Sequence, residues 1–368
     1  MPKSGPRRYA VLAIALILSA AAGLAHAETA NPRDVFRSVD NIPTADAIQS
    51  DGFVDIGGIK QWMSIRGRHK DAPILLFIHG GPGFTSLPSS YYYMRDWSEY
   101  FTVVQWDQRG AGKTYAANNP EKVRPTMTID RMVADAEEMA AYLRKTYGRR
   151  KIVLVGHSWG SIVGVKLARL HPDWFYAYVG TGQFVAFQLN ETMGYDATLA
   201  AARKDGNADA IRDLERIAPF PDMAHPDRNI ANLGTERRWL AHYGGYYWRN
   251  NVGHEGELNP FSPDYSDEEL KVRDTAQGFS IQALWSELGK VDLRGDTTFK
   301  EPVFFIQGRH DVGTNATLLG QWYGTVHAPK KKLIWLEDSA HMTFQEEPGK
   351  FLVTLVNEVL PLTKDGGR

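Results

Sequence analysis

The stretch KIVLVGHSWGSIVGVKLA, Lys151 to Ala168, changes character at the pentapeptide Gly-His-Ser-Trp-Gly in its middle. Ahead of the pentapeptide, Ile152 to Val155 is a run of β-branched and aliphatic residues, which predicts a strand buried on both faces. Behind it, Ile162 to Leu167 favours a helix. Ser158 would then stand on a tight turn from strand to helix, in a strained backbone conformation that holds its hydroxyl clear of the sheet.

The surroundings of Ser158 suit a nucleophile. Glycines on either side leave room for neighbouring backbone to pass close to the turn. The amides at the start of the following helix point toward the hydroxyl, which favours a developing negative charge there. The pentapeptide alone is a weak signal in a chain with 34 glycines among 368 residues, so the rest of the sequence has to support it.

The composition describes a globular protein and excludes several classes of function. Hydrophobic residues make up 43% of the chain, and the net charge of −1 gives no reason to expect nucleic acid as a partner. Cysteine is absent, which excludes disulfides, thiolate chemistry and cysteine-type zinc sites. No His-Glu-x-x-His sequence offers another zinc site. We therefore predict neither a metal nor a cofactor.

The first 27 residues have the pattern of a secretory signal. Lys3, Arg7 and Arg8 precede an apolar stretch, Tyr9 to Leu24, which is followed by Ala25-His26-Ala27. Cleavage after Ala27 would give a periplasmic or secreted protein with no stable membrane association. The alternative is an uncleaved anchor, for which the apolar run is short.

Strands and helices alternate along the rest of the chain. The predicted strands are 53–56, 61–66, 74–78, 101–106, 152–155, 175–179, 303–306 and 332–336, with a helix after Thr128 and a closing helix at about 348–360. This order predicts an α/β fold with a doubly wound, mostly parallel sheet. Residues 186–288 lack a clear buried strand and are interpreted as a mostly helical cap, inserted between core segments 28–185 and 289–368.

A serine hydroxyl needs a base, which is usually a histidine oriented by a carboxylate. Asp311 and His341 each follow a predicted strand, so both are expected at the same sheet edge as Ser158. Asp338 is the rival acid, although it shares a loop with His341. Among the other histidines, His310 is too close to Asp311 in sequence, His157 should point back from the turn, and His79 is interpreted as part of a glycine turn.

Acyl transfer also requires donors for an oxyanion. The backbone amide of Trp159, next to Ser158, is one candidate. The second should come from His79-Gly-Gly-Pro-Gly83, where Gly81 is preferred and Gly80 comes next, because Pro82 has no N–H. The later sequence Asp107-Gln-Arg-Gly-Ala-Gly-Lys-Thr114 lacks the spacing of a phosphate loop. Its Asp107 and Arg109 are expected to pair with each other within that loop.

The motifs in this order resemble the proline iminopeptidase branch of the α/β-hydrolase family. They are HGGPG (79–83), WDQRGAGKT (106–114), GHSWGS (156–161), GRHD (308–311) and SAHM (339–342). The resemblance covers nearly all of the chain after the leader. It implies a serine peptidase that releases an N-terminal residue, proline in the best-known cases, from a small peptide, with a helical cap over the pocket.

One position departs from that branch. Members that cleave N-terminal proline commonly carry a glutamate two residues before a His-Tyr-Phe sequence, where it binds the free amino group, and Leu240 stands at that place here. Glu236, Glu255 or Glu257 would have to replace it. The alternatives are an exported esterase or amidase with the same Ser158, His341 and Asp311, and a non-catalytic binding protein on a hydrolase scaffold. The sequence leaves the oligomeric state open.

Overall fold

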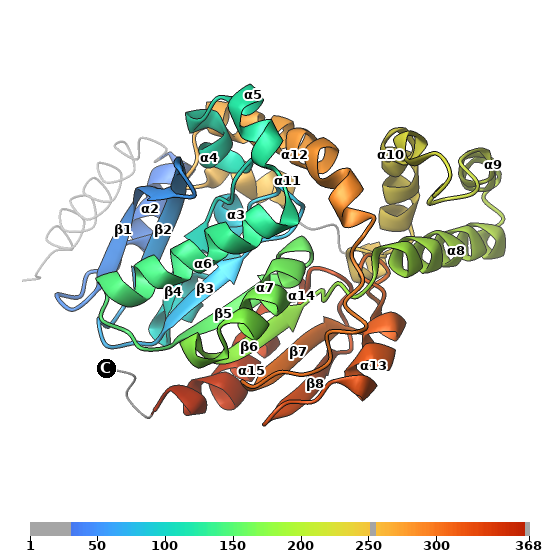
Figure 1. Ribbon diagram of the computed structural model, residues 1–368. Helices are drawn as coiled ribbons and strands as arrows, with labels where there is room; N and C mark the ends of the chain where they lie inside the picture. Colours follow the sequence, from blue (N-terminus) through green and yellow to red (C-terminus); the bar gives the residue numbers. More distant parts are fainter. Residues whose placement is uncertain (1–30, 251–254, 365–368) are drawn as a thin grey trace, which may run out of the picture.

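The computed structural model of the protein describes residues 31–250 and 255–364 (Figure 1). The predicted signal segment, 1–27, lies outside the described residues. A sheet of eight strands runs through the molecule in the order β1-β2-β4-β3-β5-β6-β7-β8. The strands are β1 Ile48–Ile56, β2 Ile59–Gly67, β3 Ile74–Ile78, β4 Thr102–Trp106, β5 Ile152–His157, β6 Phe175–Thr181, β7 Val303–Gly308 and β8 Lys331–Leu336.

The sheet is mostly parallel, which confirms the predicted fold class. Strand β2 pairs antiparallel with β1 and with β4, whereas the remaining pairs, from β4 through β3 to β8, are parallel. Parallel neighbours bring their carboxyl ends to the same edge of the sheet. The loops that follow β3, β4, β5, β7 and β8 carry the motifs singled out in the sequence, and they meet at that edge.

Helices cover both faces of the sheet, and β3 shows why. Its residues Ile74, Leu76 and Ile78 belong to one hydrophobic cluster, which includes side chains of α6 and α7, while Leu75 and Phe77 belong to a second cluster on the other face. A strand buried on both faces has an uninterrupted apolar sequence, as β3 does. Figure 1 shows α6 and α7 crossing one face and α15 lying behind the other.

The helices of the described chain extend the predicted pattern. They are α2 Pro32–Asp40, α3 Leu87–Tyr93, α4 Gly112–Ala117, α5 Pro120–Val123, α6 Ile129–Thr146, α7 Trp159–Leu170, α8 Phe187–Asp205, α9 Ala208–Arg216, α10 Pro226–His242, α11 Glu255–Leu258, α12 Asp267–Leu288, α13 Ala316–Thr325, α14 Thr343–Glu346 and α15 Pro348–Thr354. Short 3-10 or π turns lie at 95–99, 124–126, 172–174, 248–250, 259–261, 355–359 and 360–363. The closing helix, predicted at about 348–360, is α-helical only as far as Thr354, and a π turn and a 3-10 turn follow it.

Helices α8 to α12 occupy the chain between β6 and β7, and the two ends of this insertion differ in their attachment. Figure 1 shows α8, α9 and α10 projecting to one side of the sheet, while α12 lies beside α4. Helix α12 begins with a capping box between Ser266 and Glu269. The hydroxyl of Ser280 then donates to the carbonyl of Gly110, at 2.8 Å, which fastens α12 to the core.

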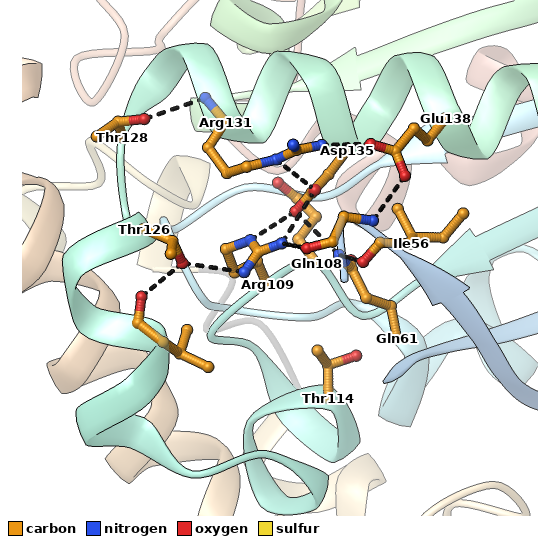
Figure 2. Close-up of polar contacts among 12 residues, drawn as sticks. Ile56, Gln61, Gln108, Arg109, Thr114, Thr126, Thr128, Arg131, Asp135 and Glu138 are labelled. Carbon is orange, nitrogen blue, oxygen red and sulfur yellow. Dashed lines mark hydrogen bonds and ion pairs between the residues drawn. The ribbon is translucent and has the colours of Figure 1, made fainter. Parts of the chain in front are cut away.

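Arg109 does not pair with Asp107, contrary to the prediction. Figure 2 shows its guanidinium under α6, where Nε and Nη2 donate to the two carboxylate oxygens of Asp135 at 2.7 and 3.1 Å. Arg109 and Asp135 have exposed fractions of 1% and 0%. Asp107 instead accepts hydrogen bonds from the Tyr265 hydroxyl and the Lys113 amide. The missed signal is Asp135 itself, because a carboxylate on the buried face of a helix requires a partner.

Asp135 gathers several donors from different elements. It also accepts from Gln61 on β2, at 2.9 Å, and from Arg131 one turn earlier on α6, at 2.8 Å. Arg109 in turn donates to the carbonyl of Gly57, in the β1-β2 turn, and to the Thr126 hydroxyl. The pair therefore ties the loop after β4 to α6 and to the antiparallel hairpin.

Replacement of Arg109 by methionine should destabilise the fold because it leaves the buried Asp135 without its bidentate partner. We expect the free energy of unfolding to fall by about 3 kcal/mol or more in urea denaturation. The matched control is Arg203→Met, which removes an ion pair with Glu215 whose side chains are 58% and 53% exposed. The control should lose less than about 1 kcal/mol. Equal losses in the two variants would contradict a structural role for the buried pair.

Candidate active site

Ser158 lies between β5 and α7, on the predicted turn. Its backbone has φ 55° and ψ −122°, a conformation that a residue with a side chain rarely adopts. The turn is this tight because α7 starts immediately after the strand and passes under the end of β3. A Cβ atom at Gly160 would overlap the carbonyl oxygen of Ile78, so only glycine fits there.

Asp311 and His341 form a hydrogen-bonded pair. Nδ1 of His341 lies 3.0 Å from Oδ2 of Asp311, and both side chains are almost fully buried. Asp311 is held by three further donors, which are the amide and hydroxyl of Thr314 at 2.7 Å each and the Gln307 amide at 2.6 Å. Such a carboxylate keeps a fixed position and fixes the ring of His341, which lines the same cavities as Ser158.

The rival acid and one of the other histidines lie elsewhere. Asp338 is exposed, and its nearest cation is Lys350 at 4.0 Å. The ring of His310 stacks on Trp248 with centroids 3.4 Å apart.

His79 is part of its glycine turn. Nδ1 donates to the carbonyl of Gly80 at 2.8 Å, while Nε2 accepts from the Gln108 amide. Burial lowers the pKa of His79 to about 4, so the ring is neutral. It therefore serves as a fixed hydrogen-bonding group within the turn.

His157 was expected to point back from the turn, but its side chain lies next to the His341 loop. Its ring is buried beside that of His341, with centroids 4.9 Å apart, and Nε2 lies 3.3 Å from the His341 carbonyl oxygen. Burial holds the pKa of His157 well below its usual value, so the ring is neutral. A neutral ring here supports the His341 loop without adding a charge next to the His341 ring.

Gln108 connects the two loops that were predicted to supply oxyanion donors, a role that the sequence did not indicate. Its side chain donates to the carbonyl of His79, at 2.9 Å, and accepts from the indole nitrogen of Trp159, at 3.2 Å. Gly81 and Trp159 line the same cavity as Ser158. Because Gln108 precedes Arg109, the buried ion pair with Asp135 holds this bridge in place.

Two cavities meet at Ser158. The small cavity measures about 150 Å³ and the large cavity about 840 Å³, and both take part of their lining from the insertion. They share six lining residues: Gly81, Ser158, Arg237, Tyr246, Gln277 and His341. A substrate bond held at Ser158 would therefore have a separate cavity for each of the two groups that it joins.

Comparison with known proteins identifies the family to which this fold belongs. The family model for the alpha/beta hydrolase fold matches residues 73–348. The probable aminopeptidase YbaC of Bacillus subtilis (strain 168) is 31% identical over 320 residues, which cover 85% of this chain and 97% of that protein. The chain belongs to the α/β-hydrolase fold family.

Further relatives confirm the resemblance to proline iminopeptidases. The proline iminopeptidase of Neisseria gonorrhoeae is 24% identical over 331 residues, covering 84% of this chain and 96% of that protein. The crystal structure of a proline iminopeptidase-related protein from Thermus thermophilus has the same fold, with a TM-score of 0.62 at 18% identity over 86% of this chain and 99% of that one.

Three ionisable side chains of the α/β-hydrolase insertion form a cluster, Glu191–Arg237–Glu236, beside the small cavity. Nη2 of Arg237 donates to both oxygens of Glu191, at 2.8 and 2.6 Å, and Nη1 donates to Oε2 of Glu236. Glu191 and Arg237 line the small cavity, and Oε1 of the buried Glu236 has no hydrogen-bond partner in the described chain. Two carboxylates around one guanidinium carry a net negative charge when both are ionised.

The other two candidate acids differ from this cluster. Glu255 lines the large cavity and accepts from Gln345 and Ser89 at 2.7 and 3.3 Å, and its burial raises the pKa of its carboxyl. Glu257 is exposed and lines neither cavity. Within the described ranges, no cluster of three or more possible ligands is arranged to bind a metal ion, and no helix is long and apolar enough to cross a membrane.

Relief of the strain at Ser158 provides a test of the turn geometry. Ser158→Gly should increase the free energy of unfolding by about 1 kcal/mol, because the strain of about 1–3 kcal/mol exceeds the extra chain entropy of glycine. Ser158→Ala is the matched control, since it removes the hydroxyl but keeps the Cβ atom and gains nothing. Thermal denaturation compares the two variants. Equal stability of the glycine and alanine variants would show that the backbone is not strained.

Proposed function

We propose that this α/β-hydrolase is a serine hydrolase, and more specifically an aminopeptidase that releases an apolar N-terminal residue. The observation that carries the proposal is the His341–Asp311 pair beside a strained Ser158, at the meeting point of two cavities. The aminopeptidase and proline iminopeptidase names of its relatives favour a peptide substrate. The signal pattern of residues 1–27 supports action outside the cytoplasm.

The first half of the reaction forms an acyl-enzyme. The Ser158 oxygen attacks the carbonyl carbon of the substrate while Nε2 of His341 takes the hydroxyl proton. Asp311 keeps the Nδ1–H tautomer of His341 and stabilises the imidazolium that forms. The oxygen of the tetrahedral intermediate receives hydrogen bonds from the amides of Gly81 and Trp159. When the intermediate collapses, the proton on His341 passes to the leaving amine.

The second half repeats these steps with water. His341 takes a proton from a water molecule, whose oxygen attacks the acyl carbon, and Ser158 leaves with the proton that His341 returns. The same amides hold the second oxyanion. The products are a free carboxylic acid and the amine released in the first half.

The Glu191–Arg237–Glu236 cluster supports recognition of a free amino group. The α-ammonium of an N-terminal residue is bonded to the carbon next to the scissile carbonyl, so it must lie close to Ser158. The cluster borders the small cavity at that place and has one carboxylate more than it has cations. It would thus take the place of the glutamate that Leu240 replaces.

An esterase or amidase on the same residues is the second candidate. The observation that favours it is that Arg237 already pairs with both glutamates, which reduces their attraction for an ammonium. In that case the free amino group of a substrate would not improve turnover.

Covalent labelling tests the chemistry first. A fluorophosphonate probe should label the wild-type protein, and the label should disappear in Ser158→Ala and fall strongly in His341→Ala. Turnover should fall at least about 1000-fold in either variant, and combining them should add little, because these residues act as a unit. A folded wild-type protein that the probe does not label would contradict the proposal.

Anilides with a free or blocked amino group, together with short-chain esters, distinguish the two candidates. An aminopeptidase should cleave only the free-amine anilides, and Glu191→Gln should raise KM for them with little change for esters. Glu255→Gln serves as the matched control, since it removes a buried charge from the large cavity. Ester turnover without any cleavage of the free-amine anilides would favour the esterase.

The pH profile gives a separate test of the amino-group site. Burial raises the pKa of Glu236, so this carboxyl keeps its proton to a higher pH than an exposed glutamate does. An ammonium group binds the ionised form. We divide kcat/KM for free-amine substrates by kcat/KM for blocked or ester substrates. This ratio should therefore rise as the pH rises through the raised pKa of Glu236. In Glu236→Gln the ratio should not rise over the pH range below about 7, where the substrate amine stays protonated, whereas an unchanged rise would exclude Glu236 from the site.

A further inference from the structure

Apolar side chains form part of the lining of the small cavity. Ile162 of α7 and Phe184 form its core side, while Phe187, Leu233, Trp285 and Leu288 come from the insertion. The rings of Phe187 and Trp285 pack edge to face with centroids 5.3 Å apart, and both are buried. The lining also includes polar side chains, among them Glu191, Arg237 and His341. A group bound in this cavity would therefore contact both polar side chains and an aromatic and aliphatic surface.

The volume of this pocket fits a benzene ring. It measures about 150 Å³. Engineered cavities of about 150 Å³ with Leu, Ile and Phe walls stay dry and bind benzene. A smaller group such as the proline ring or a methyl group would leave part of the pocket empty, and the lining atoms would lose contacts there.

The arrangement around Ser158 also determines which part of a substrate enters. An N-terminal residue has its side chain and its ammonium on the same carbon, next to the carbonyl. The small cavity is lined by apolar side chains and by Glu191 and Arg237 of the Glu191–Arg237–Glu236 cluster. Trp159, a proposed oxyanion donor, also lines it. The large cavity, at about 840 Å³, has room for the several residues that follow the scissile bond.

We propose that the small cavity is the specificity pocket for a large apolar N-terminal side chain, phenylalanine in the first place, and that proline is a poor substrate. The inference rests on the proposed function and makes it more specific. Full burial of a phenyl group should favour phenylalanyl over alanyl substrates by about tenfold to hundredfold in kcat/KM. The prolyl substrate should resemble the alanyl one.

The substrate series consists of phenylalanine, leucine, alanine and proline p-nitroanilides with free amino groups. Ile281→Phe and Leu233→Phe each fill the pocket, since they replace half-buried lining residues with a larger side chain. Either variant should abolish the advantage of phenylalanine while alanine turnover persists. Leu189→Phe is the matched control, because Leu189 is 37% exposed on α8 and lines neither cavity. Equal or faster cleavage of the proline or alanine anilide by the wild type would overturn the inference and leave the aminopeptidase intact.

A binding measurement keeps the pocket testable if the proposed chemistry fails. Phenylalaninamide, alaninamide and prolinamide are titrated calorimetrically into Ser158→Ala, which should be folded and unable to turn them over. Phenylalaninamide should bind at least about tenfold more tightly than the other two. Ile281→Phe in the same background should remove the difference. Equal affinities of the three amides would overturn the pocket assignment, whereas absence of fluorophosphonate labelling with selective binding would overturn only the chemistry.

Discussion

Arg109 and Asp135 form an ion pair that is buried under α6, and the loops around Ser158 depend on it. The pair fixes the residue before Arg109, Gln108, whose side chain joins the His79 turn to Trp159. Two charges out of water are tolerated only when each is fully paired, and here Gln61, Arg131 and the Gly57 carbonyl complete the set. The geometry at the sheet edge thus rests on a charge network outside the cavities that Ser158 lines.

The parts of this structure that could be predicted are those with local patterns. The strands from β3 to β8 are largely apolar runs between turn residues, and each motif follows one of them. The sheet edge where Ser158, Asp311 and His341 lie could therefore be predicted from the sequence. Within the region interpreted as a mostly helical cap, no separate helix was predicted at 226–242, where α10 lies. The Arg109–Asp135 pair was missed because its partners are 26 residues apart, so the position of Asp135 on the buried face of its helix indicates a partner but not which one.

The acids around the small cavity illustrate the same limit. Leu240 marks a missing glutamate in the sequence, but the sequence does not indicate that Glu191 on α8 and Arg237 on α10 meet at the cavity. Their contact depends on how two helices of the insertion pack against each other. Glu236 was among the candidates, whereas Glu191 could be found only from the structure.

The small cavity takes its walls from two sources that lie apart in the chain. Ser158, Trp159 and Ile162 belong to the core, whereas Phe187, Leu233 and Trp285 belong to the insertion between β6 and β7. In the proposed function, bond breaking and side-chain selectivity are therefore encoded in different stretches of sequence. Mutational drift within the insertion can alter the range of substrates over evolutionary time while the reacting atoms stay where the sheet holds them.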